Sequence, residues 1–248
     1  MITSARMLAL CAILLAPPLA RADEGCRLEL GRGWPPGTEN HGSAVEQLLS
    51  RHADAPVLTL TLLPLRGAES GLVLIPGEGE GDWAVRHAKA EHRVSDWSNS
   101  RDGARRELRT EQEPLIDQAA IPAGIARRVV ALWQRTLTAL VPADRAAPFH
   151  DDNVWLFALR DPASGEVLRV SGLAPGCGPA ELLMAQRERI IDTIDDDPED
   201  RHRGWAKLEA SLRELQDRLE REPAIASAAP GNADATVSAT AGDNDGND

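Results

Sequence analysis

The sequence predicts an α+β protein in which an antiparallel meander sheet and a hairpin are packed by two amphipathic helices, with a C-terminal heptad helix. Three observations predict this class. Apolar and polar residues alternate from Leu58 to Leu62, which is typical of a half-buried strand. An apolar stripe with the helical period follows in residues 121–142. After residue 200, apolar residues recur at spacings of three and four, which is the pattern of a heptad seam.

Residues 1–22 are predicted to be a cleaved secretory signal peptide. Arg6 precedes an apolar run over residues 7–15, and the tripeptide at 20–22 (ARA) provides a small-x-small cleavage site before Asp23. The apolar run is too short to cross a bilayer, which requires about 20 apolar residues. We therefore expect a mature chain that begins at Asp23, has no membrane span, and is periplasmic or secreted.

The first part of the mature chain is expected to have little regular structure. Residues 23–44 are rich in glycine and proline and are predicted to be an irregular segment. Residues 45–195 are predicted to form the α+β domain. It opens with a short helix over residues 43–53, in which Ser43 is the expected N-cap and Glu46 follows three residues later, as in a capping box.

The centre of the predicted domain is a meander with one face exposed to water, as antiparallel sheets allow. Its expected strands are residues 56–65, 71–76, 83–94 and a more polar strand over 104–112. The strongest predicted helix follows, and we expect Trp133 within it to cover the sheet. The residues expected to be buried together are Leu58, Leu60, Leu62, Val129, Trp133, Leu137, Val154, Leu156, Leu168, Val170 and Ile190.

The second half of the domain is predicted to be a hairpin and a further helix. Residues 153–173 read as two strands joined by a Pro/Ser/Gly turn. Pro179 is expected in the first turn of the next helix, where proline needs no amide hydrogen.

Residues 196–222 are predicted to be an acidic linker followed by an amphipathic helix. The narrow apolar seam of this helix is expected to dock on another helix, which belongs either to this domain or to a partner protein. Residues 223–248 have no periodicity and little apolar bulk, so we expect a disordered tail. The predicted partner-binding residues of the seam are Trp205, Leu208, Leu212, Leu215 and Leu219.

Two cysteines remain once the signal peptide, with Cys11, is removed. In an oxidising compartment the pair Cys26 and Cys177 is expected to form a disulfide. One alternative is that Cys177, just ahead of a predicted helix, is a nucleophile activated by the helix N-terminus, and another is that both cysteines are free thiols. No histidine lies near Cys177 in the sequence to act as its base.

The charge of the chain disfavours nucleic acid and anionic lipid as partners. The full chain carries a formal charge of −12, and removing residues 1–22 takes away two arginines and no acidic residue, which leaves −14. No P-loop, GxGxxG or HExxH motif is present, and no cofactor or metal is expected. His150, Asp151 and Asp152 form the one adjacent trio suited to acid–base or metal chemistry.

The order of these elements carries one resemblance. The segments ALWQRTL, DDNVWLFAL and VSGLAPGCGPAELL, within residues 56–195, resemble uncharacterised small secreted or periplasmic α+β proteins of high-GC Gram-negative bacteria. The resemblance implies no activity. From the residues themselves we expect an exported, non-catalytic protein that binds a protein partner, and an inhibitor or immunity-like role fits the acidic surface. The alternative is a periplasmic hydrolase or thiol enzyme that uses Cys177 or the His150 trio.

Overall fold

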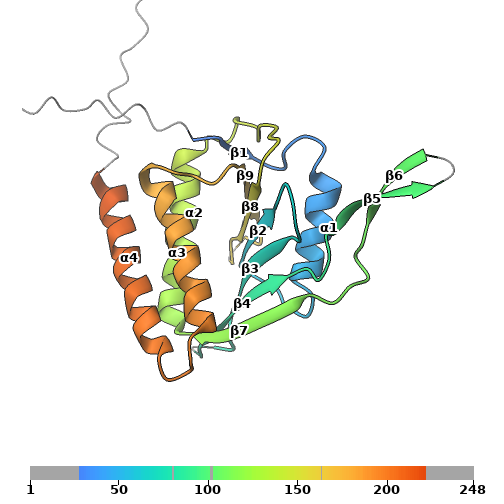
Figure 1. The fold of residues 1–248 in the computed structure, drawn as a ribbon. Coiled ribbons are helices and arrows are strands. Elements are labelled where there is room, and N and C mark those ends of the chain that lie inside the picture. The colour runs from blue at the N-terminus through green and yellow to red at the C-terminus, as the bar shows by residue number, and fades with distance from the viewer. Residues whose placement is uncertain (1–27, 80, 101–102, 163, 222–248) are drawn as a thin grey trace, which may run out of the picture.

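A computed structural model describes residues 28–79, 81–100, 103–162 and 164–221, and it confirms the α+β class (Figure 1). Seven antiparallel strands form one sheet in the order β1-β9-β8-β2-β3-β4-β7, and two further strands form a separate hairpin. The strands of the sheet are β1 (Leu30–Arg32), β2 (Leu58–Leu63), β3 (Ser70–Ile75), β4 (Trp83–Lys89), β7 (Leu115–Ile121), β8 (Val154–Arg160) and β9 (Val167–Gly172). The separate hairpin is formed by β5 (Ser95–Ser100) and β6 (Gly103–Leu108).

Helices cover both faces of the sheet. The helix α1 (Glu39–Leu49) lies on one face, where it contacts β2 and β3. On the other side, α2 (Ala123–Leu140), α3 (Gly178–Asp195) and α4 (Arg201–Arg221) pack against one another, and α3 contacts β4 and β7 (Figure 1). The central strands are consequently buried on both faces, so the prediction that one face of the meander is exposed to water is wrong. Thr61, predicted to face water, is fully buried.

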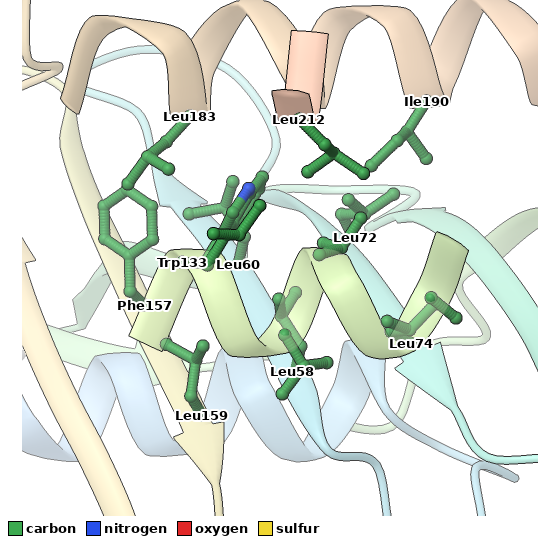
Figure 2. Packing of buried hydrophobic residues seen from close by; sticks show 14 of the residues in the cluster. Leu58, Leu60, Leu72, Leu74, Trp133, Phe157, Leu159, Leu183, Ile190 and Leu212 are labelled. Carbon is green, nitrogen blue, oxygen red and sulfur yellow. The ribbon is translucent and has the colours of Figure 1, made fainter. Parts of the chain in front are cut away.

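The main core lies between the sheet and the three helices. Trp133 is fully buried at its centre, and its ring meets Phe157 edge-on at 6.1 Å between centroids (Figure 2). Leu58 and Leu60 of β2 belong to the same core as Trp133, as the alternation predicted (Figure 2). Of the residues expected to be buried together, seven belong to this core: Leu58, Leu60, Val129, Trp133, Leu137, Val170 and Ile190, with Leu62 and Leu168 partly buried against it.

A second, smaller core lies under α1. Val154 and Leu156 belong to it rather than to the main core, which corrects their predicted placement. Their neighbours Trp155, Phe157 and Leu159 face the three helices instead. Because β8 is apolar at nearly every position, its sequence has no alternation from which the two faces can be assigned.

The segment predicted to be irregular, residues 23–44, contains regular structure from Leu30 onward. Residues 28–44 include β1 and the first half of α1. Thr38, not Ser43, is the N-cap residue of α1, so the predicted capping box is wrong. Gly42 lies inside α1, where the ring of Trp34 packs directly against its backbone. A Cβ at this position would lie 2.0 Å from that ring, so only glycine permits this packing.

The heptad helix packs on its own domain. All five seam residues are buried in the main core, and Leu208, Leu212 and Leu215 are fully buried. The assignment of this seam to a partner protein is therefore corrected, and the seam contacts α2 and α3. A buried polar relay joins the three helices: Trp133 Nε1 donates to Gln186 Oε1 at 2.7 Å, and Gln186 Nε2 donates to the Ser211 carbonyl at 3.1 Å.

Candidate functional site

The strands β5 and β6 form an arm, described for residues 95–100 and 103–108, that projects from the rest of the molecule (Figure 1). The arm is the distal half of a long β-ribbon. In its proximal half β4 pairs with β7, where Lys89 faces Leu115, and in its distal half β5 pairs with β6, where Ser95 faces Leu108. The five residues between β4 and β5 face six between β6 and β7. The pairing of the two strands is interrupted over these connecting segments, and the ribbon bends there (Figure 1).

A buried carboxylate anchors the base of the arm on one side. Glu69 is fully buried, and its Oε2 accepts a hydrogen bond from the Val94 N–H at 2.7 Å. Its Oε1 lies 2.7 Å from Nε2 of His41 on α1. Burial by itself would raise the pKa of Glu69, but the hydrogen bonds from His41 and Val94 outweigh it and lower that pKa. The carboxylate therefore stays ionised and holds the bend to α1.

An arginine anchors the other side of the base. Arg51 donates to the Thr110 carbonyl at 2.7 Å and to the Gln112 carbonyl at 2.9 Å, and it pairs with the Glu113 carboxylate. The side chain of Gln112 then accepts from the N–H of His92 at 2.7 Å, which joins the two connecting segments. Both sides of the bend are thus fixed to the domain.

Beyond this anchored base, the arm has no packing support from the main sheet. Its two strands contact each other extensively, and no other described element contacts either strand to a comparable extent. Leu108 is 41% exposed at its base. Isolated two-stranded hairpins are only marginally stable in water. In β6 the described side chains from Arg105 to Leu108 are exposed to solvent.

The ribbon also leaves the sheet with an open edge. Strand β7 is the last strand in the order, and Leu115 and Ile116 at its start are 61% and 37% exposed. Edge strands normally carry features that prevent further pairing. The edge strand β7 follows the arm directly along the chain.

A polar cavity lies on the α1 side of the sheet. Its volume is about 310 Å³, and it is bounded by α1 and by strands β2, β8 and β9. Glu46 of α1 and Arg169 of β9 form an ion pair across it, with Nη1 of Arg169 at 3.0 and 2.9 Å from the two carboxylate oxygens. Burial raises the pKa of Glu46 in spite of the charge and hydrogen bonds of Arg169. The Arg169 guanidinium also stacks over Trp34, 5.0 Å from the ring centroid.

The His150 trio does not converge. His150 is mostly buried, and its Nδ1 lies 3.6 Å from a Glu29 carboxylate oxygen, whereas Asp151 and Asp152 are exposed. The Asp152 carboxylate accepts a hydrogen bond from the neighbouring N–H of Asn153. Within the described ranges, no group of three or more His, Cys, Asp or Glu residues is arranged to hold a metal ion. The three residues are therefore not arranged as a metal site, and acid–base use of His150 stays a prediction.

Cys177 is the N-cap residue of α3, at the position predicted from the sequence. Cys177 has an interaction partner. Cys26 lies outside the described residues, so the Cys26–Cys177 pairing stays a prediction. The signal peptide and the residues of the predicted tail, 223–248, also lie outside the described ranges.

The sequence did not predict the arm as a separate hairpin, although the polar surroundings of Trp97 made this residue a candidate for an exposed binding surface. Residues 104–112 were predicted as a fourth meander strand, whereas β6 pairs with β5 outside the main sheet. The two strands are polar, so neither shows the alternation that marks a half-buried strand. Glu69 and Arg51 gave no signal, because their partners are 25 to 62 positions away in the chain.

No protein-family model matches this chain, and neither the curated proteins nor the solved structures contain a match. The resemblance to secreted proteins of Gram-negative bacteria therefore stays a prediction. None of the described helices has the length and apolarity that a membrane-spanning helix needs.

Proposed function

We propose that this chain is an exported, non-catalytic protein that binds another protein through the arm at residues 95–108. The observation that carries the proposal is a hairpin anchored at its base by Glu69 and Arg51, in which the described β6 side chains from Arg105 to Leu108 are exposed. A preorganised recognition element loses less conformational entropy on binding than a flexible loop does. Trp97 lies on β5 of this arm, and tryptophan is among the residues most often dominant in protein interfaces.

The charge distribution favours a particular kind of encounter. The chain as a whole carries −12, whereas residues 95–109 contain four arginines and three acidic residues. An acidic domain attracts a basic partner over long range and speeds association. The mixed charges of the arm then supply local, pairwise contacts. An inhibitor or immunity-like role in the periplasm or outside the cell fits this arrangement.

The arm can be replaced by a short turn, because the two ends of the chain at its base are hydrogen-bonded neighbours. The Arg109 N–H donates to the Val94 carbonyl at 2.8 Å, so the two chain ends lie side by side. Replacing residues 95–108 by Asn-Gly, which favours a two-residue hairpin turn, should join these two ends. We expect the variant to fold with an unchanged thermal transition and to lose capture of the partner from envelope extract.

A matched control keeps this test specific. The double substitution Arg213→Ala and Glu214→Ala changes two exposed residues of α4 on the opposite side of the molecule, and it should leave capture intact. Capture of the same protein by the armless variant would refute the role of the arm. Recovery of the full-length chain, with residues 1–22 still attached, from the cytosol would refute export.

We also propose that Cys26 and Cys177 form a disulfide in the mature protein. Strand β1 runs antiparallel to β9, with Leu30 opposite Gly172, and the Leu173 N–H donates to the Glu29 carbonyl at 3.2 Å. Continuing this register by three residues would bring residue 26 opposite residue 176, next to Cys177. Neighbours across a strand pair lie within the Cα separation that a disulfide spans.

The disulfide is tested by counting thiols. The mature protein, denatured without reductant, should give no reaction with Ellman's reagent, and two thiols should appear after reduction. Two reactive thiols before reduction would contradict the pairing and would also weaken the case for an oxidising compartment.

A further inference from the structure

The cavity under α1 lies beside Ala158 of β8 and Val167 of β9, past the part of β8 where Leu156 packs under the helix. Thr59 pairs with Ala158, which pairs with Arg169, so the three side chains lie in one row and point to the α1 face. Helix α1 contacts β2 and β3, and the small side chain of Ala158 leaves the floor beside them open. Exposed Gln47 and Arg160 stand at its mouth.

The cavity has an excess of positive charge in a strongly negative chain. Two arginines, Arg160 and Arg169, face one carboxylate, Glu46. Arg169 uses only Nη1 on Glu46, and Arg160 uses only Nη1 on the Gly165 carbonyl at 3.2 Å. Among the described residues, their other guanidinium nitrogens have no acceptor. Guanidinium groups recognise carboxylates through paired N–H donors, so this donor capacity fits an anion.

Further unused polar groups line the same space. Neither the Ser43 nor the Thr59 hydroxyl, nor the Gln47 amide, makes a side-chain hydrogen bond within the described part of the chain. Between them lie the apolar surfaces of Pro56, Ala158 and Val167. Small-molecule sites combine apolar walls with a few convergent polar groups and a residue of perturbed pKa.

We propose that this cavity binds a small monocarboxylate with an apolar body, whose carboxylate meets Arg160 and the free edge of Arg169. One net positive charge suits a singly charged group, and the Glu46 carboxylate beside it disfavours the second charge of a phosphate. The volume of 310 Å³ equals the liquid volume of about ten water molecules, so it admits a ligand of roughly that number of non-hydrogen atoms. The site lies apart from the arm and is independent of the proposed partner binding.

Benzoate and hexanoate are suitable probes, with benzamide, hexanamide and inorganic phosphate as comparisons. Titration of the mature protein, followed by calorimetry and by ligand-observed NMR, should give saturable binding of both carboxylates. For so few atoms we expect a dissociation constant on the order of 1 mM. The two amides and phosphate should bind at least about tenfold more weakly, because they lack the charge or the fit for the guanidinium pair.

Two variants locate the binding. Arg160→Gln removes one exposed cation and should weaken carboxylate binding by about tenfold. Ala158→Leu keeps every charge but fills the floor, and it should abolish binding while the thermal transition is retained. Arg213→Gln on α4 is the control and should bind as the wild-type protein does.

The result is decisive either way. Carboxylate binding that is weakened by both cavity variants and unchanged in the control supports the proposal. Equal binding of carboxylates and amides, phosphate binding as tight as benzoate binding, wild-type affinity in both cavity variants, or no saturable binding would each overturn it.

Discussion

The side chains of Trp133 and Gln186 should be energetically coupled, because they form a hydrogen bond with each other and both are fully buried. Trp133 Nε1 and Gln186 Oε1 are 2.7 Å apart, and both residues are fully buried. Gln186→Met conserves apolar volume but leaves the indole N–H without an acceptor, which costs about 1–3 kcal/mol. Trp133→Phe leaves the amide oxygen unpaired and adds the cost of a cavity, so its penalty should be larger.

The double variant separates the hydrogen bond from the packing. When both partners are absent, no buried polar atom of this pair is left unsatisfied, so the double variant should be more stable than the two single losses imply. We expect a coupling free energy of about 1–3 kcal/mol. Equilibrium unfolding in urea followed by far-UV circular dichroism measures all four proteins without depending on tryptophan fluorescence.

A matched substitution on the surface sets the baseline. Gln216 lies on α4 and its amide donates to Glu220, which is exposed, so Gln216→Met should change stability by less than about 0.5 kcal/mol. Additivity of the Trp133 and Gln186 losses to within about 0.5 kcal/mol would refute the reasoning, because it would mean that the two side chains do not interact.

Three further outcomes follow from burial and charge. Leu212→Ala should cost about 3–5 kcal/mol in urea unfolding, because the side chain is fully buried, whereas Arg213→Ala beside it should be near neutral; equal effects would place the seam in water. Thr61→Val should be neutral or stabilising by up to about 1 kcal/mol, because Thr61 Oγ1 is buried and unpaired within the described residues, and a clear loss would contradict that. The lowered pKa of Glu69 means that its stabilising contribution is present above the ordinary value of 4.5 and is lost as pH falls through the folded-state value. Acid titration of stability should therefore be steeper in the wild type than in Glu69→Gln, and identical slopes would argue against an ionised Glu69.

How far the sequence predicted this fold depends on which signal each element carried. The alternation at Leu58, Leu60 and Leu62 assigned the helix-facing side of β2 correctly, since it reflects a local period. It also predicted that Thr59 and Thr61 face water, whereas α1 covers them. That helix begins at Glu39, four residues ahead of the expected cap, in a stretch whose glycine and proline content indicated a loop.

Local sequence patterns could not predict the candidate sites, because the residues of each site are far apart in the chain. The anchor of the arm joins His41 to Glu69 and Glu69 to Val94, which are 28 and 25 positions apart in the chain. In the cavity, Glu46 and Arg169 are 123 positions apart. Such contacts are set by strand order and register, which a single sequence does not specify. Conversely, the adjacency of His150 with two aspartates was visible in the sequence, but neighbouring residues in a loop need not point to one place.

The heptad helix shows why a correct pattern led to a wrong partner. A seam one residue wide per turn is the signature of a helix that packs on helices, since a helix lying on a sheet buries a wider stripe. That inference holds: α4 contacts α2 and α3 rather than the sheet. The pattern specifies the kind of surface that a helix needs but not the chain that supplies it. Here the pair α2 and α3 supplies it within the same domain, so the seam of α4 is already covered, and for this reason the proposed recognition element is the arm instead.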